Sequence, residues 1–310
     1  MIPAFNEEES IASVIKSIPR KIAGISKVEV LVVNDGSTDK TVEAARKACA
    51  DKIAGHLKNK GLGITFKEGI EAAIQMKADI IVNIDGDGQF DTKDIPRIIR
   101  PILEGKADVV TCTRFGVKEL EPEMPAVKRF GNEIFTRTVS FLTGKKFTDT
   151  QCGFRAYSRE AALNMSLFGK YTYVQEVLLN LIFKGFEIIE VPCKVKGERK
   201  GKSRLVKHWW DYGLRALLII ARTLRDYNPL KFFGTLGVGM FLLGALSAFA
   251  LWVRLLLKHA IDPFLWVVYA DVILIILGFL LIILALLADM NDRQRKIQEE
   301  ILYRIKKKGF

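Results

Sequence analysis

The segment from Asp79 to Gln89, DIIVNIDGDGQ, joins a short apolar run to an acidic turn. Its first half is rich in Ile and Val, which predicts a buried β-strand. Asp85 and Asp87 flank one glycine, so both carboxylates can face one hard cation, with Gln89 adding a neutral oxygen. Such donors suit Mg²⁺ or Mn²⁺ bridging a diphosphate. A plain Asp/Gly turn is the alternative, whereas an EF-hand loop is excluded because Phe90 stands where that loop needs glycine.

Short β-branched runs alternate with helical patterns from residue 28 to residue 191. We expect helices from about Thr38 and from about Thr92, and strands at Val28–Val33, Asp79–Ile84, Asp108–Cys112 and Glu187–Val191. This order predicts an α/β fold with a mostly parallel sheet and helices on both faces. Ligands of such sheets bind beyond the carboxyl ends of the strands, which is where the polar clusters 34–39 and 85–89 fall.

The cluster Asn34–Asp39, NDGSTD, predicts a turn that leads into a helix, with Ser37 or Thr38 as the N-cap. Asp35 would lie at the end of a strand, where its carboxylate can accept hydrogen bonds from a base or a ribose. The opening residues MIPAFNEEE read as the end of a strand followed directly by a helix. We therefore expect the true start of the chain to lie upstream of Met1, with the first strand truncated.

Two apolar stretches near the C-terminus are long enough to cross a membrane. Phe232–Val253 has no charged residue, and Pro263–Ala288 is interrupted only by Asp271. They predict a transmembrane hairpin within 231–289, with spans at 232–257 and 263–288. A charge inside a span is costly, so we expect Asp271 to pair with Arg254 across the hairpin.

The net charge of +12 is concentrated beside this hairpin. Lys194–Lys231 holds 11 Lys or Arg against 3 Asp or Glu, and Asn291–Phe310 holds 7 against 3. The positive-inside rule therefore places both basic segments and the N-terminal domain in the cytoplasm, and this location disfavours a nucleic-acid partner. The predicted organisation is a catalytic domain at 1–204, an interfacial amphipathic helix at 205–230, the hairpin, and a basic tail at 290–310.

The four cysteines, at positions 49, 112, 152 and 193, are widely spaced and form no Cys-x-x-Cys pair. This spacing suggests neither a zinc site nor a disulfide framework.

Five motifs taken in order resemble glycosyltransferase family 2, in its dolichol-phosphate mannose synthase and polyprenyl-phosphate glycosyltransferase branch. They are PAFNE at 3–7, NDGSTD at 34–39, DGDGQ at 85–89, DTQCGFR at 149–155, and EVP at 190–192 followed by RKGKS at 199–203. The resemblance covers about residues 1–205. It implies a GT-A fold and an inverting, metal-dependent transfer of one hexose from a nucleotide sugar to dolichyl or polyprenyl phosphate at the cytoplasmic membrane face.

The resemblance also implies roles for individual residues. They are nucleotide binding by Pro3, Phe5, Glu7, Asn34, Asp35, Asp85 and Gly86; metal binding by Asp85, Asp87 and Gln89; catalysis by Asp87, Arg114, Arg129 and Arg199; and contact with the acceptor phosphate by Arg114, Arg129 and Ser203. Phe5 stands where the family often has tyrosine, and Asn34 where it has a first aspartate, so the nucleotide stays open between GDP-mannose, UDP-glucose and a UDP-N-acetylhexosamine.

A lipid-phosphate acceptor explains why the resemblance assigns arginines to the site. A lipid phosphate is already anionic at neutral pH, so it needs positioning and charge neutralisation more than a strong base. Glu176 is the alternative candidate for a general base. A processive synthase is disfavoured because the chain has no Gln-x-x-Arg-Trp motif and only two spans. An inactive, membrane-tethered nucleotide-sugar-binding module and a homo-oligomer remain open.

Overall fold

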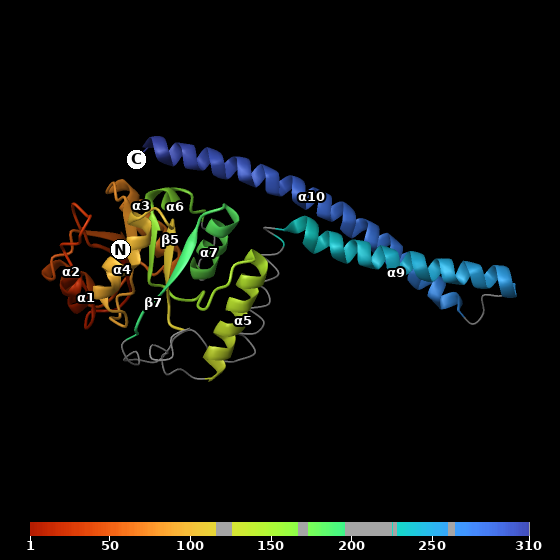
Figure 1. Ribbon diagram of the computed structural model, residues 1–310, viewed down its shortest axis with the longest axis horizontal. Helices are drawn as coiled ribbons and strands as arrows, with labels where there is room; N and C mark the ends of the chain where they lie inside the picture. The colour runs from red at the N-terminus through yellow and green to blue at the C-terminus, as the bar shows by residue number, and fades with distance from the viewer. Residues whose placement is uncertain (116–125, 167–172, 196–224, 226–227, 260–263, 310) are drawn as a thin grey trace. The chain divides into compact units, whose positions relative to one another are not determined.

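The computed structural model describes residues 1–115, 126–166, 173–195, 225, 228–259 and 264–309 (Figure 1). The chain divides into two compact units, one formed by Met1–Leu214 with Tyr303–Phe310 and the other by Arg215–Leu302. Nearly all of the expected interfacial helix at 205–230 lies outside the described residues, as do Arg199 and Ser203.

The first unit is an α/β domain. In chain order its elements are β1 (Ile2–Ala4), α1 (Ile11–Ser17), β2 (Leu31–Asp35), α2 (Thr41–Lys47), β3 (Lys52–His56), α3 (Leu62–Gln75), β4 (Ile80–Asn83), the 3₁₀ turn η1 (Thr92–Asp94), α4 (Ile95–Leu103), β5 (Val109–Thr113), α5 (Ala126–Thr143), β6 (Arg155–Ser158), α6 (Arg159–Leu163), α7 (Tyr173–Phe183) and β7 (Ile188–Pro192).

The strands form two ladders that meet at the start of the chain. One has the order β1-β2-β3 and is parallel throughout. The other has the order β4-β6-β5-β7, in which β6 runs antiparallel to both neighbours. Met1 N donates to Val82 O, and Ile84 N donates to Met1 O, so β1 lies beside β4. The predicted mostly parallel sheet is confirmed.

Helices cover both faces of this sheet, because the strands have apolar side chains on both sides. Residues of α1, α2 and α4 pack with alternate strand residues into one core, which includes Ile2, Val32 and Val110. On the other face, Phe66 of α3 meets Tyr157 of β6 edge to face, with ring centroids 6.1 Å apart. The sequence did not predict β3 or β6, because neither KIAGH nor RAYS is an apolar, β-branched run.

The expected N-cap at Ser37 or Thr38 is wrong, since α2 begins at Thr41. Ser37 Oγ instead accepts a hydrogen bond from Asn6 N (3.0 Å) in the loop after β1. The turn before α2 is stabilised by Asp39, whose Oδ1 accepts a hydrogen bond from Thr41 N (3.0 Å). The Ser37 hydroxyl therefore joins the loop after β2 to the loop after β1.

The expectation of no disulfide is also wrong, because Cys112 and Cys193 are bonded. They are 81 residues apart in sequence, but β5 and β7 are neighbours, and Cys193 N donates to Thr113 O. Their Cα atoms lie 5.6 Å apart as a result. Only strand pairing, which cysteine spacing does not report, brings them together.

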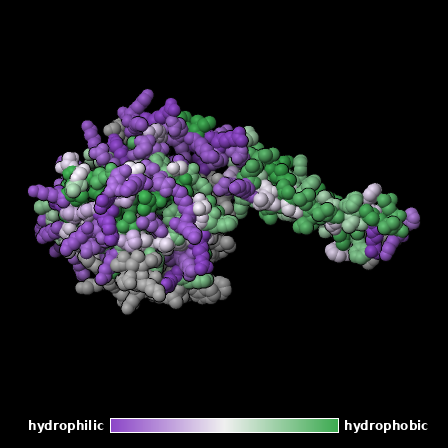
Figure 2. All heavy atoms as spheres, in the orientation of Figure 1, coloured by the Kyte–Doolittle hydropathy of each residue, from purple (hydrophilic) through white to green (hydrophobic). Residues whose placement is uncertain are grey.

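Two helices of the described chain, one in the second unit and one that runs from it into the first, are long and apolar enough to cross a membrane. These are α9 (Pro229–Lys258) and α10 (Leu265–Gly309); α9 and the first half of α10 present mostly hydrophobic side chains (Figure 2), whereas the second half of α10 is rich in charged residues. They pack closely through small residues: a Cβ at Gly237 would lie 2.9 Å from Gly278 O. Residues 290–309 of the expected basic tail belong to α10.

The expected pair between Arg254 and Asp271 is wrong. Asp271 packs opposite Gly244, whereas Arg254 lies ten residues further along α9, or about 15 Å along the helix axis. The Arg254 guanidinium instead lies 4.5 Å from the ring centroid of Phe264. One oxygen of the Asp271 carboxylate is buried and has no hydrogen-bond partner among the residues that the structure describes.

Candidate functional site

The acidic turn after β4 packs against the start of the chain. Gly86 is buried, and a Cβ there would lie 3.4 Å from both Ile2 Cγ2 and Pro3 O. Ser10 Oγ lies 2.7 Å from Gly86 O and 2.9 Å from Glu7 Oε2, so one hydroxyl links the turn to the loop after β1. A small residue at position 86 therefore lets the acidic turn lie beside β1.

Two half-buried carboxylates stand on this turn, Asp85 and Asp87. Asp87 Oδ1 accepts from Gln89 N (3.1 Å), which fixes the loop conformation. Among the described residues, no group of three or more His, Cys, Asp and Glu could hold a metal ion by itself. Mg²⁺ and Mn²⁺ need no such cage, because they commonly take one or two carboxylates and complete their shell with water and substrate phosphates. The donor set therefore fits a metal bound together with a diphosphate.

The loop after β1 is tied to the loop after β2. Asn6 has a left-handed backbone (φ 54°), and its side-chain oxygen accepts from Thr38 N (2.9 Å). Glu7 N donates to Thr41 Oγ1 (2.8 Å). Asn34 Oδ1 accepts from Ser37 N (3.0 Å), so its amide shapes the turn. These bonds bring the sequence-predicted residues of the two loops to the same edge of the sheet.

Asp35 is buried at that edge and organises the loop after β3. Its Oδ1 accepts from His56 Nε2 (2.9 Å), Lys60 N (2.8 Å) and Gly61 N (3.2 Å). The other ring nitrogen of His56 lies 2.9 Å from Glu68 Oε2. Sequence reasoning missed this His56 link, although a histidine at the end of a strand and a glutamate twelve residues later are visible in the sequence.

Gly36 permits the same loop to approach. Its φ of +71° lies in the left-handed region, and a Cβ there would lie 2.5 Å from backbone atoms of Lys58 and Asn59. Any side chain at position 36 would therefore push away the loop that Asp35 holds.

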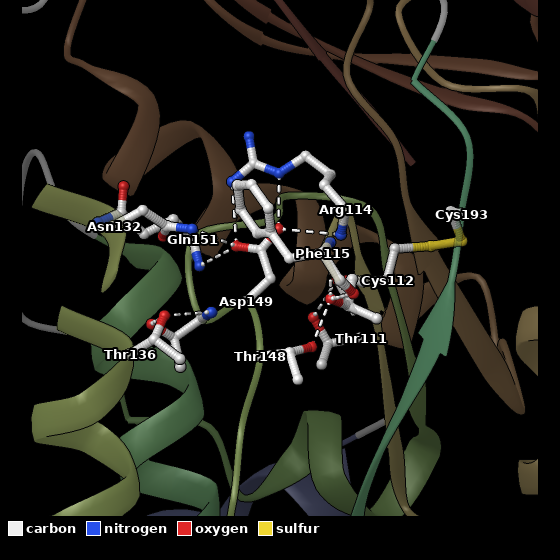
Figure 3. Close-up of polar contacts among 12 residues, drawn as sticks. Thr111, Cys112, Arg114, Phe115, Asn132, Thr136, Thr148, Asp149, Gln151 and Cys193 are labelled. Atoms are coloured by element: carbon white, nitrogen blue, oxygen red, sulfur yellow. Dashed lines mark hydrogen bonds and ion pairs between the residues drawn. A yellow bond between two sulfur atoms is a disulfide. The ribbon is translucent and has the colours of Figure 1, made fainter. Parts of the chain in front are cut away.

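Arg114 and Asp149 form a clamped ion pair at the end of β5 (Figure 3). Asp149 is fully buried; Arg114 Nε donates to its Oδ2 (2.6 Å) and Arg114 Nη2 to its Oδ1 (3.0 Å). Burial lowers the pKa of Arg114, but the hydrogen bonds and charge of Asp149, with smaller contributions from Cys152 and Asp85, raise it above its ordinary value. The guanidinium is thus a fixed positive charge within electrostatic reach of the acidic turn.

A second acid holds the segment that carries Asp149. Glu190, on β7, accepts from Asp149 N (2.9 Å) and from Thr148 N (2.8 Å). Burial raises the pKa of Glu190, while these hydrogen bonds oppose the rise. Asp149 and Glu190 both lie in motifs that the sequence singled out, but no role was assigned to either, because their partners are distant in sequence.

Arg155 cross-links three chain segments close to the Arg114–Asp149 pair. It is fully buried on β6, and its guanidinium donates to Thr111 Oγ1 (3.1 Å), Thr150 O (2.9 Å) and Val174 O (2.6 Å). It thereby ties the segment next to Asp149 to the first turn of α7, which carries the half-buried Glu176.

Arg129 lies on α5, where it lines a cavity of about 330 Å³ together with Phe115, Asn132 and Thr148. Asn132 Nδ2 also donates to Asp149 Oδ1 (3.4 Å), so this cavity adjoins the ion pair. The roles that the resemblance implies for Arg129, and for the nucleotide and metal residues, stay predictions.

A family model described as glycosyl transferase family 2 matches residues 1–164. Among curated proteins, a dolichyl-phosphate hexose transferase of Haloferax volcanii is 34% identical over 201 residues, which cover 65% of this chain and 83% of the relative. A UDP-N-acetylglucosamine–dolichyl-phosphate N-acetylglucosaminyltransferase of Methanococcus voltae is 30% identical over 213 residues, which cover 63% and 83%.

Among solved structures, glucosyl-3-phosphoglycerate synthase from Mycobacterium tuberculosis, in complex with Mn²⁺, UDP and phosphoglyceric acid, matches with a TM-score of 0.54. The match has 24% identity and covers 72% of this chain and 75% of that one. At this identity the likeness speaks for the fold alone. It supports the GT-A arrangement that the sequence predicted.

Proposed function

Because the chain is a member of glycosyltransferase family 2, we propose that it transfers one sugar from a nucleotide sugar to dolichyl or another polyprenyl phosphate, with Mg²⁺ or Mn²⁺ as cofactor. The observation that carries the proposal is the buried Arg114–Asp149 pair, whose guanidinium interacts electrostatically with Asp85 of the acidic turn. Two apolar helices supply the membrane attachment that a lipid acceptor requires. Both curated relatives described above carry dolichyl phosphate in their names.

The acidic turn would hold the donor. Asp85, Asp87 and Gln89 would bind the divalent ion, whose positive charge, when it is bound, stabilises the departing nucleoside diphosphate. Pro3, Phe5 and Glu7 would line the nucleotide pocket. In this proposal Asp35 and Asn34 act partly through the loops they shape, since their side chains already bind backbone N–H groups.

The acceptor phosphate would lie on the opposite side of the reacting sugar, near Arg114 and Arg129. Asp149 occupies Nε and Nη2 of Arg114, so the guanidinium is held in one orientation and offers its remaining edge to a phosphate. A phosphate positioned this way attacks the anomeric carbon as an anion and needs no strong base. Arg199 and Ser203 would complete the phosphate site.

We assign residues 1–204 to a cytoplasmic catalytic domain, 205–230 to an interfacial helix, 231–289 to the membrane hairpin and 290–310 to a cytoplasmic tail. The basic residues on both sides of the hairpin support this orientation. A hexose is the first choice of sugar. An N-acetylhexosamine is the second, favoured by the relative from Methanococcus voltae.

The test uses the 310-residue chain in detergent with dolichyl phosphate, Mn²⁺ or Mg²⁺, and radiolabelled GDP-mannose, UDP-glucose or UDP-N-acetylglucosamine. We expect one donor to label the lipid extract, and EDTA to abolish the signal. Asp87→Asn should lower kcat by more than about 100-fold and weaken Mn²⁺ binding in the presence of the nucleotide. Asp91→Asn is the matched control, because Asp91 caps η1 and asparagine caps as well. Turnover of Asp87→Asn equal to that of Asp91→Asn would refute the metal assignment.

A further inference from the structure

The outer face of α5 carries an exposed apolar stripe. Phe130, Ile134 and Phe141 are 65%, 38% and 86% exposed, and their spacing places them on one side of the helix. The opposite side is buried: Asn132, Phe135, Thr136 and Val139 face the domain. An apolar seam on the solvent side of an amphipathic helix requires an explanation, since large exposed aromatics mark interaction sites.

The stretch of sequence that carries this stripe is rich in Lys and Arg. The stretch 126–146 contains five Lys or Arg and one Asp or Glu. Arg129 and Lys146 are exposed, and Arg137 is 79% exposed beside Glu133 (2.6 Å). Exposed aromatic side chains on a helix rich in Lys and Arg are the composition that binds the headgroup region of membranes containing anionic lipid.

The stripe is too small for a stable protein interface. With roughly 200 Å² for each large side chain, the three residues expose on the order of 400 Å². A standard interface buries about 800 Å² on each partner. A bilayer needs no complementary partner surface, and the chain has two helices able to cross one, so a membrane is always within reach of this domain.

The buried face of α5 contacts the segment that carries Asp149. Asn132 Nδ2 donates to Asp149 Oδ1 (3.4 Å), and Thr136 Oγ1 lies 3.2 Å from Thr150 Oγ1. The cavity of about 330 Å³ along α5 includes Arg129 and Thr148. Figure 1 shows α5 on the outside of the sheet, beside α7.

We propose that α5 is a membrane-contact helix, whose Phe130, Ile134 and Phe141 enter the headgroup region of an anionic bilayer and hold the acceptor cavity at the lipid surface. The link to the acceptor rests on the proposed function; the membrane contact itself does not. In this arrangement a lipid phosphate reaches Arg129 and Arg114 without leaving its bilayer.

The first test measures depth without using activity. The 310-residue chain with Cys49→Ser receives a nitroxide label at Phe141→Cys or Phe130→Cys, or at Leu57→Cys as the control, and is reconstituted into phosphatidylcholine–phosphatidylglycerol vesicles. Leu57 is 99% exposed in the loop after β3. We expect labels at 130 and 141 to collide more with oxygen and less with a water-soluble nickel chelate than the label at 57. Equal accessibility at the three positions overturns the proposal, and so does spin–spin broadening at 141, which would indicate a second copy.

The second test uses transfer to dolichyl phosphate. In vesicles, Phe130→Ser with Phe141→Ser should raise KM for the lipid about tenfold, equivalent to about 1.4 kcal/mol. The kcat should stay unchanged with a detergent-solubilised, short-chain acceptor, and Leu57→Ser should behave as wild type in both assays. An unchanged KM in vesicles overturns the link to the acceptor. If no acceptor is labelled at all, the proposed function fails, while the depth measurement still decides the membrane contact.

Discussion

Replacing Asp149 by asparagine tests how the Arg114–Asp149 pair is built. Asp149 is fully buried and accepts five hydrogen bonds: from Arg114 N, Nε and Nη2, from Asn132 Nδ2 and from Gln151 N. Asparagine keeps one acceptor oxygen, but its NH₂ group would face N–H donors that then lack an acceptor. The Arg114 charge then lacks its counter-ion, although the guanidinium stays largely buried.

The magnitude follows from the burial of the pair. Removing one partner of a buried ion pair costs about 3–5 kcal/mol. The Arg114 side chain is 20% exposed, so water recovers part of this cost. We therefore expect the lower end, about 3 kcal/mol, which corresponds to about a 150-fold change in an opening equilibrium.

Cys152 provides the assay, because it lies three residues from Asp149 and is 1% exposed. Its alkylation requires local opening, so in a Cys49→Ser background the alkylation rate reports the opening equilibrium. Asp149→Asn should accelerate this reaction about 150-fold. The matched control is Asp108→Asn, since Asp108 accepts from Glu187 N (3.0 Å) but is paired with no arginine of the described residues.

Combining Asp149→Asn with Arg114→Gln separates the ion pair from the other bonds. If the ion pair causes the effect, the two changes are not additive. The opening free energy of the double variant then falls by about 2 kcal/mol or more less than the sum of the two single changes. Additivity within about 0.5 kcal/mol, or an alkylation rate for Asp149→Asn equal to that of Asp108→Asn, would refute the reasoning.

Three further outcomes are expected. At pH 8, a maleimide should label Cys49 but not Cys152, because burial raises the pKa of Cys152 to about 12 and keeps its thiol protonated; peptide mapping that finds both labelled equally contradicts this. His56→Gln should raise KM for the donor about tenfold and leave kcat within about twofold, since it loosens the loop held by Asp35 without touching reacting groups; a fall in kcat alone would count against it. Asp271→Leu should raise the thermal stability of the detergent-solubilised chain, because it removes a buried carboxylate oxygen that has no hydrogen-bond partner among the described residues, and a lower midpoint would point to an unrecognised partner.

Glu190 and Arg155 hold the chain segment that carries Asp149, and so they help to fix the Arg114–Asp149 ion pair at this edge of the sheet. Glu190 holds the backbone of Thr148 and Asp149, and Arg155 holds Thr150 from below. A guanidinium fixed in this way needs no reorganisation when an anion binds, which is the property that electrostatic catalysis requires.

Local patterns in the sequence determined a large part of this protein. The run DIIVNIDGDGQ has a composition that predicts a buried strand followed by a turn, and the structure has β4 at Ile80–Asn83 with both carboxylates just beyond it. The two apolar stretches determined the long helices α9 and α10 by length and composition. The ordered motifs determined the family, because each combines residue types with a fixed position after a strand.

Pairing between distant segments was decided only by the tertiary structure. Cys112 meets Cys193, Asp149 meets Arg114, and His56 meets Asp35 because particular strands are neighbours, and strand order is not written in any local window. The Arg254–Asp271 prediction failed for the same reason, since the register of the hairpin follows from close packing at Gly237 and Gly244 rather than from charge. Local sequence sets which element forms, whereas side-chain partners depend on which elements the packing of the whole core brings together.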